Sequence, residues 1–120
     1  GISTVYTASV EVPGGPLRII GTPITYPSPF SSNRQKICYI QYTLSKDANI
    51  DIYIADVTGQ RVKRFVLAAG EEGGSAGVNK ISWDGITDQG VMAGNAIYVG
   101  VIVARDENKL LDKFKLTIVN

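Results

Sequence analysis

Apolar and polar residues alternate along most of this chain, in short runs that turn-favouring residues separate. A period of two is typical of a β-strand with one buried face, whereas helices need a period of about 3.6, which no segment sustains. The run 96–104 is apolar on both faces, as expected of a central strand between two layers. Strands are predicted at 5–12, 36–44, 49–57, 61–68, 78–83, 96–104 and 110–119.

Seven or so short strands with turn signals between them predict an all-β fold, an antiparallel immunoglobulin-like β-sandwich. In the third predicted strand Ile50, Ile52 and Ile54 fall on the inward face. Asp51 and Tyr53 alternate with them and are therefore expected to face outward.

The prolines divide the chain into two parts. All five fall before residue 31, and the rest of the chain is free of proline. Because proline resists central strands, residues 1–22 are predicted to be a lead-in strand and a Pro/Gly-rich linker, and residues 23–120 the sandwich. The strand 5–12 belongs either to this sandwich, to the end of a preceding domain, or to a contact with another copy of the chain. We expect a terminal module of a longer protein.

The stretch from Ile81 to Gly90 carries the only tryptophan, Trp83, at the end of a strand pattern. Two turns follow at once, and Asp84 with Gly85 opens the first of them. An aspartate can bond its own backbone and a glycine tolerates positive φ. Trp83 is therefore expected in the core, with Asp84 and Gly85 holding the corner beside it. The same chemistry predicts a turn from Asp56 to Gly59.

Asp84 and Asp88, four residues apart, also raise the possibility of a Ca²⁺ site. Calcium takes six to eight oxygen ligands, several of them carboxylates. Two aspartates without a suitably placed glutamate are a poor set, so hydrogen bonding to backbone amides in the turn is the favoured interpretation. No cofactor is predicted.

Composition excludes several classes of function. The chain of 120 residues is 44% hydrophobic, has a formal net charge of +1 and contains no histidine. No apolar run approaches the roughly 20 residues of a membrane-spanning helix, and no basic stripe points to nucleic acid. Without histidine there is no Ser-His-Asp triad and no base for Cys38, the single cysteine. An enzyme is not expected.

Exposed tyrosines favour one alternative function. Sugar-binding modules stack pyranose rings on flat aromatic faces, and Tyr39 and Tyr53 are predicted on outward faces of neighbouring strands. A carbohydrate-binding accessory module of a secreted glycoside hydrolase is therefore the second hypothesis, with a glycan as ligand. The assignment of the only tryptophan to the core counts against it.

Five groups of residues, taken in order, resemble the immunoglobulin-like, fibronectin type III-like domain of the flagellar hook-capping protein FlgD and of the C-termini of many secreted bacterial proteins. The resemblance covers about residues 23–120. Ser28 stands where that family commonly has Asn, and Ala55 is an extra residue that predicts a bulged turn. The groups are Tyr26-Pro27-Ser28-Pro29-Phe30, Ile40-x-Tyr42-x-Leu44, Ala48 to Val62 with Asp56 and Gly59, Trp83-Asp84-Gly85-x-x-Asp88-x-Gly90, and Gly94-x-x-Ile97-Tyr98.

The resemblance implies an extracytoplasmic, non-catalytic structural or interaction module. In a hook cap it would help flagellar subunits to assemble, and at the end of a secreted protein it would serve attachment or sorting. Its partners would be other protein domains, either upstream in the same chain or a second copy through residues 5–12. Tyr98, in the last of the five groups, is also expected to have a structural role.

Replacing Trp83 with alanine should lower the free energy of unfolding by roughly 3–5 kcal/mol, because a large buried side chain leaves a cavity. Urea denaturation measures the difference. A loss below about 1 kcal/mol would refute the core assignment, since burial of the ring accounts for the expected loss.

Overall fold

Two antiparallel sheets pack face to face, because each alternating strand has one apolar face to bury. The computed structural model describes residues 16–31 and 33–120, and these residues contain no helix. The strands are β1 (Ile24–Tyr26), β2 (Cys38–Leu44), β3 (Ile50–Ala55), β4 (Arg61–Leu67), β5 (Gly77–Trp83), β6 (Ala96–Ala104) and β7 (Lys109–Ile118).

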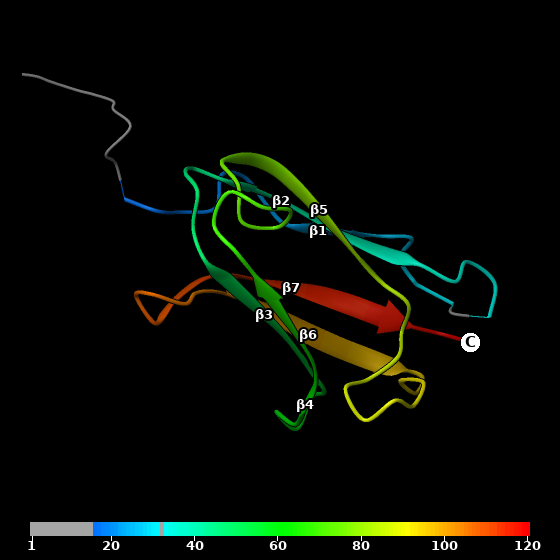
Figure 1. The fold of residues 1–120 in the computed structure, drawn as a ribbon. Coiled ribbons are helices and arrows are strands. Elements are labelled where there is room, and N and C mark those ends of the chain that lie inside the picture. The colour runs from blue at the N-terminus through cyan, green and yellow to red at the C-terminus, as the bar shows by residue number, and fades with distance from the viewer. Residues whose placement is uncertain (1–15, 32) are drawn as a thin grey trace, which may run out of the picture.

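One sheet has the strand order β1-β2-β5 and the other β4-β3-β6-β7. Figure 1 shows the two sheets as layers, with β1, β2 and β5 above the other four strands. The predicted antiparallel β-sandwich is confirmed. β6 lies between β3 and β7, as its two apolar faces predict.

Six of the observed strands match predicted ones within a few residues at each end. β1 was not predicted, because its three residues lie between Pro23 and Pro27 in the Pro-rich part of the chain, where proline disfavours central strands. The predicted strand 5–12 lies outside the described residues. The predicted bulge is present, since the pairing of β3 with β4 shifts between Ile54 and Ala55.

The core lies between the inward faces of the sheets. Ile50, Ile52 and Ile54 are fully buried, as their alternation predicts. Trp83 is also in the core, at 2% exposure. The other large side chains that are fully buried are Phe30, Tyr42, Ile40, Leu44, Ile102, Leu116 and Ile118.

The corner after β5 ties the two sheets together. The Trp83 Nε1–H donates to the carbonyl of Ile86 at 2.8 Å, and the Ile86 amide donates to Asp84 Oδ1 at 2.9 Å. Two residues on, the Asp88 amide donates to the carbonyl of Val62 in β4, at 2.9 Å. The corner therefore fixes the tryptophan of one sheet and an edge strand of the other.

The described part of the predicted linker packs on the sandwich. Leu17 belongs to the hydrophobic core. The Ile20 amide donates to the carbonyl of Thr43 at 2.9 Å, which extends the edge of the sheet beyond β1. Farther along, Phe30 crosses to the other sheet, where its amide donates to the carbonyl of Thr117 in β7 at 2.8 Å.

Gly100 provides a test of packing between β6 and β7. A Cβ at this position would clash with the Phe114 ring, whereas a Cβ at Gly94 meets nothing within 4 Å. Gly100→Ala should therefore lower the free energy of unfolding by about 1–3 kcal/mol, the usual effect of overpacking. Gly94→Ala is the matched control and should change it by less than about 0.5 kcal/mol. Equal effects in urea melts would contradict the packing described here.

Candidate functional site

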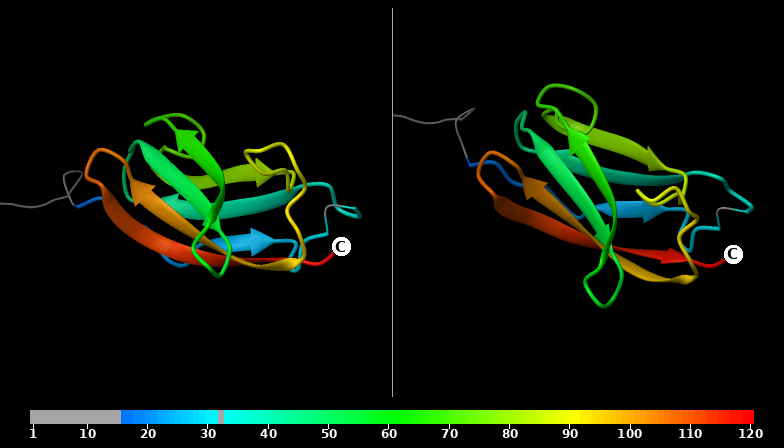
Figure 2. Two further views of the ribbon diagram at one scale, coloured as in Figure 1. Left: turned by 90° about the horizontal axis from the view of Figure 1, so that it is seen from below. Right: turned by 60° about the horizontal axis from the view of Figure 1, so that its bottom comes forward.

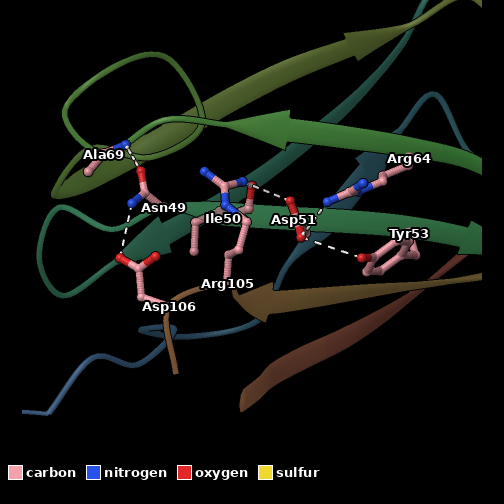
Figure 3. A network of polar contacts seen from close by, with 8 residues as sticks. All are labelled: Asn49, Ile50, Asp51, Tyr53, Arg64, Ala69, Arg105 and Asp106. Carbon is pink, nitrogen blue, oxygen red and sulfur yellow. Dashed lines mark hydrogen bonds and ion pairs between the residues drawn. The ribbon is translucent and has the colours of Figure 1, made fainter. Parts of the chain in front are cut away.

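The outer face of the four-stranded sheet holds a buried carboxylate. Asp51 alternates with the inward isoleucines of β3 and so lies on the outer side, as predicted. It is not exposed as an outward aspartate would be, because only 5% of its side chain is accessible. Figure 3 shows the reason: Arg64 of β4 and Arg105, which follows β6, converge on it from two neighbouring strands.

The contacts of Asp51 engage both carboxylate oxygens. Arg105 Nη1 lies 2.8 Å from Oδ1, and Arg64 Nη2 lies 3.1 Å from Oδ2. The Tyr53 hydroxyl donates to Oδ2 at 3.4 Å. Charge-assisted bonds to two arginines offset the desolvation of the carboxylate. Asp51 therefore holds two flexible cations in fixed positions.

The pKa of Asp51 reflects this balance. Burial acts to raise the pKa, but hydrogen bonds from Arg105 and Arg64, together with their charges, outweigh burial and hold the pKa below its usual value. The same hydrogen bond and the charge of Asp51 raise the pKa of Arg64. Both side chains are therefore charged at neutral pH.

Tyr53 stands beside the carboxylate and attracts two cations. The Arg61 guanidinium lies 3.9 Å from the ring centroid, and that of Arg64 lies 5.6 Å from it. Cations at such distances are attracted by the aromatic quadrupole. Val66, 59% exposed, pairs with Asp51 across the strands and adds apolar surface. We call this surface the arginine face; it comprises Tyr53, Arg61, Arg64, Val66 and Arg105, with Asp51 beneath.

The hairpin residues beside the arginine face are fixed as well. Asn49 Nδ2 donates to Asp106 Oδ2 at 3.0 Å, and Asn49 Oδ1 accepts the Ala69 amide at 2.9 Å (Figure 3). The Arg105 amide donates to the carbonyl of Asn49 at 2.9 Å. These bonds fix the backbone from which Arg105 reaches Asp51.

The two tyrosines predicted as a sugar platform do not share a surface. Tyr39 is in β2 and Tyr53 in β3, which belong to different sheets, so the expectation of neighbouring strands is wrong. Alternation alone cannot assign a strand to a sheet. The Tyr39 ring packs against Tyr26 with centroids 5.5 Å apart, and the Lys80 ammonium lies 4.5 Å from its centroid.

Asp84 and Asp88 direct their carboxylates to different partners. Asp84 accepts the Ile86 amide within its own turn. Asp88 Oδ2 instead accepts the Arg64 amide of β4 at 3.0 Å, and Oδ1 lies 3.3 Å from Lys63 Nζ. Among the described residues there is no group of three or more metal-binding side chains.

The remaining predicted structural residues lie in turns and in the core. Asp56 Oδ1 accepts hydrogen bonds from the Thr58 hydroxyl at 2.6 Å and from the Thr58 amide at 2.9 Å. These bonds, led by that of the hydroxyl, lower the pKa of Asp56. Gly59 has a φ of +90°. Tyr98 is buried, and its hydroxyl donates to the carbonyl of Gly94 at 2.7 Å.

Burial keeps two titratable groups, the Cys38 thiol and the Tyr42 hydroxyl, uncharged at neutral pH. Burial raises the pKa of the Cys38 thiol to about 11, against a smaller lowering by a backbone hydrogen bond at Tyr26. A thiol with so high a pKa holds little of the reactive thiolate at neutral pH. Burial also raises the pKa of Tyr42, whose hydroxyl donates to the carbonyl of Gly73 at 2.7 Å. The described residues contain no helix that could cross a membrane.

Sequence reasoning missed the arginine face. Arg64 and Arg105 lie far apart in the chain and meet only through the pairing of β3 with β4 and β6. One signal was available: an aspartate between isoleucines in a central strand requires charged partners if it is covered.

No family model matches this sequence, and no curated protein matches it. Among solved structures, dimeric latent PorU from Porphyromonas gingivalis has a region 20% identical over 93% of this chain, with a TM-score of 0.67. PorZ, a surface component of the type-IX secretion system of Porphyromonas gingivalis, is 12% identical over 82% of this chain, with a TM-score of 0.55. The chain spans 10% of the PorU chain and 11% of the PorZ chain.

An immunoglobulin-like protein from Pseudomonas aeruginosa matches over nearly its whole length. It is 13% identical over 88% of this chain and 98% of its own, with a TM-score of 0.53. Identities this low show a shared fold alone. The immunoglobulin-like β-sandwich is therefore established for this chain, and regions of PorZ and PorU share it.

Asp51→Asn should lower the free energy of unfolding by about 1–3 kcal/mol at pH 7, because charge-assisted bonds to two arginines are lost. The native pKa of Asp51 is lowered, so its stabilisation is complete above the unfolded value of about 3.9 and is lost as pH falls through the native pKa. Urea melts should therefore show a difference from wild type that shrinks below about pH 4.

Glu107→Gln removes the same charge from an exposed position in the hairpin after β6 and serves as the control. It should leave the free energy of unfolding within about 0.5 kcal/mol of wild type. An Asp51→Asn effect that stays constant from pH 7 to pH 3 would show that the carboxylate charge is not the cause.

Proposed function

We propose that this chain is a non-catalytic interaction module of a secreted or cell-surface bacterial protein, and that it binds a partner protein through the arginine face. The observation that carries the proposal is the buried Asp51, which fixes Arg64 and Arg105 on an outer sheet face. The core of a β-sandwich does not require charged side chains paired on the outer face of a sheet. Burial of a carboxylate is costly, so a preorganised surface is the function that this arrangement supports.

The composition of the arginine face matches that of protein interfaces. Tyrosine and arginine are the residue types enriched at binding hot spots. Arginines that are already held lose less conformational entropy when a partner binds. The face holds three arginines and one carboxylate, so it carries excess positive charge and favours a partner with acidic side chains around an apolar contact.

The structural neighbours support a cell-surface setting. PorZ is a surface component of the type-IX secretion system, and in both PorZ and PorU the similar region is a small part of a longer chain. We propose a comparable place for this chain, as an attachment or sorting module of an extracytoplasmic protein. Hook-cap assembly, which the FlgD resemblance implies, is a second setting for the same surface. Sugar binding has less support, because Arg61 lies over the Tyr53 ring and Lys80 over Tyr39.

Photo-cross-linking in the living cell tests the proposal. A photoreactive residue replaces Val66 on the arginine face of the parent protein, produced in its own bacterium. The control replaces Val78, which is 66% exposed and belongs to a strand of the other sheet. We expect a discrete protein adduct from position 66 and none from position 78. Adding Arg61→Glu should reduce the adduct at least about fivefold, since it reverses one charge at the contact.

Three outcomes would contradict the proposal. They are an adduct from position 78 alone, equal adducts from both positions, and no adduct from either. An adduct from position 66 that contains glycan instead of protein would replace it with the carbohydrate-binding hypothesis.

A further inference from the structure

The strand β6 carries apolar side chains on the outer face of the four-stranded sheet as well as on the inner face. Tyr98, Ile102 and Ala104 are buried in the core. The residues that alternate with them point outward, and these are Ile97, Val99, Val101 and Val103. The three valines are only partly buried, and Ile97 is 49% exposed. The outer face of an antiparallel sheet is commonly polar, so this apolar row indicates an interaction surface.

No second layer covers this row in the part of the chain that the structure describes. A strand that is apolar on both faces is typical of a sheet with a layer on each side. Figure 2 shows the four-stranded sheet from its outer side in the left view, and no other strand lies in front of it. The three-stranded sheet is the only sheet that packs on it among residues 16–31 and 33–120.

Cations border the apolar row on both sides. Residues that pair across neighbouring antiparallel strands project to the same face of the sheet. One line of paired residues across the four strands reads Arg64, Tyr53, Val101 and Lys113. The next line reads Arg61, Ala55, Val99 and Lys115. Each line therefore has a cation of β4 at one end, a cation of β7 at the other end, and aromatic or apolar side chains between them.

Most of these cations are not neutralised within the sheet. Arg64 is paired with Asp51. Within residues 16–31 and 33–120, no carboxylate lies at ion-pair distance from Arg61, Lys113 or Lys115. Asp112 Oδ1 accepts the backbone amide of Lys113 at 2.8 Å. A partner with acidic groups toward both β4 and β7 would therefore match the charge of this face.

The outer face suits a helix better than a strand. The backbone of β6 is already paired with β3 on one side and with β7 on the other. The face therefore presents side chains only, and an added strand would find no backbone groups to pair with. A helix satisfies its own backbone hydrogen bonds and packs on a sheet through one apolar stripe.

The dimensions of the face agree with one helix. Three strand spacings of about 4.8 Å separate β4 from β7, so the two rows of cations lie about 14 Å apart. A helix with its side chains is about 10–12 Å across, and acidic residues at the two borders of its apolar stripe would lie beside the two rows. The apolar row from Ile97 to Val103 is about 20 Å long. A helix of about 13 residues covers that length.

We propose that the outer face of the four-stranded sheet binds an amphipathic α-helix of a partner protein, with the apolar stripe of the helix along β6 and acidic residues on both borders of the stripe. One border faces Arg61 and Arg64, and the other faces Lys113 and Lys115. This inference rests on the proposed function, because the arginine face forms one half of the site. It adds the half on β6 and β7 and the class of segment that binds there.

Photo-cross-linking at two positions of β6 tests the inference in the parent protein, produced in its own bacterium. A photoreactive residue replaces Val99 in one variant and Val103 in another, and mass spectrometry locates the partner residue that each captures. The two positions lie about 13 Å apart along the strand. A helix places the captured residues about 7–11 positions apart in the partner sequence, whereas an extended segment places them about four apart. We expect the helical spacing, in a segment with acidic residues on both borders of an apolar stripe.

A charge reversal on β7 tests the second row of cations. Lys115→Glu should lower the yield of the adduct from position 66 at least about threefold, because a helix that covers the face contacts both edges. Lys80→Glu, in β5 of the other sheet, is the matched control and should leave that yield unchanged. A partner confined to the arginine face would not respond to Lys115→Glu, because about 14 Å exceeds the screening length of about 8 Å in physiological salt. Thermal melts of the purified chains show that both variants are folded.

The outcomes separate this inference from the proposed function. An adduct from position 66 without any from 99 or 103 would overturn the inference and leave the proposed function in place. Captured residues about four positions apart, a lipid adduct, or capture of a second copy of this chain would also overturn it. Equal yields with Lys115→Glu and Lys80→Glu would do the same. Absence of adducts from 66, 99 and 103 would overturn both.

Discussion

Each strand of this domain must bury one face against the opposite sheet, and the rest of the structure depends on that constraint. Ile50, Ile52 and Ile54 satisfy it for the central strand β3. Trp83 satisfies it for β5, and its corner reaches across to the other sheet. Because the inward faces pack against each other, a partner can contact only the outer faces, the edges and the loops.

Around Asp51, on the outer face of the four-stranded sheet, electrostatic interactions and not apolar packing determine how the side chains are arranged. A carboxylate that is 5% accessible needs compensation, and Arg64 and Arg105 supply it from the two strands that flank β3. The sheet pairing therefore determines which cations meet, and the buried charge determines how firmly they are held. Tyr53 completes the surface because its ring attracts both the held Arg64, 5.6 Å from the centroid, and Arg61, 3.9 Å from it.

Much of the fold could be predicted from the sequence, and the site could not. Period-two alternation finds β2 to β7 because burial of one face imposes it on each strand separately. β1 is not predicted, because three residues between prolines are too few to show apolar and polar alternation. The pairing of Tyr39 with Tyr26, and of Asp51 with two arginines, depends on which strands become neighbours. Alternation within a strand contains no information on that choice.

The central claim is that Asp51 makes the arginine face rigid. Side-chain ¹⁵N relaxation of the arginine guanidinium groups at neutral pH tests it most directly, with the exposed Arg34 as internal reference. The account predicts restricted guanidinium motion on the picosecond-to-nanosecond scale for Arg64 and Arg105, and free motion for Arg34. Motion of Arg64 and Arg105 as free as that of Arg34 would contradict the account.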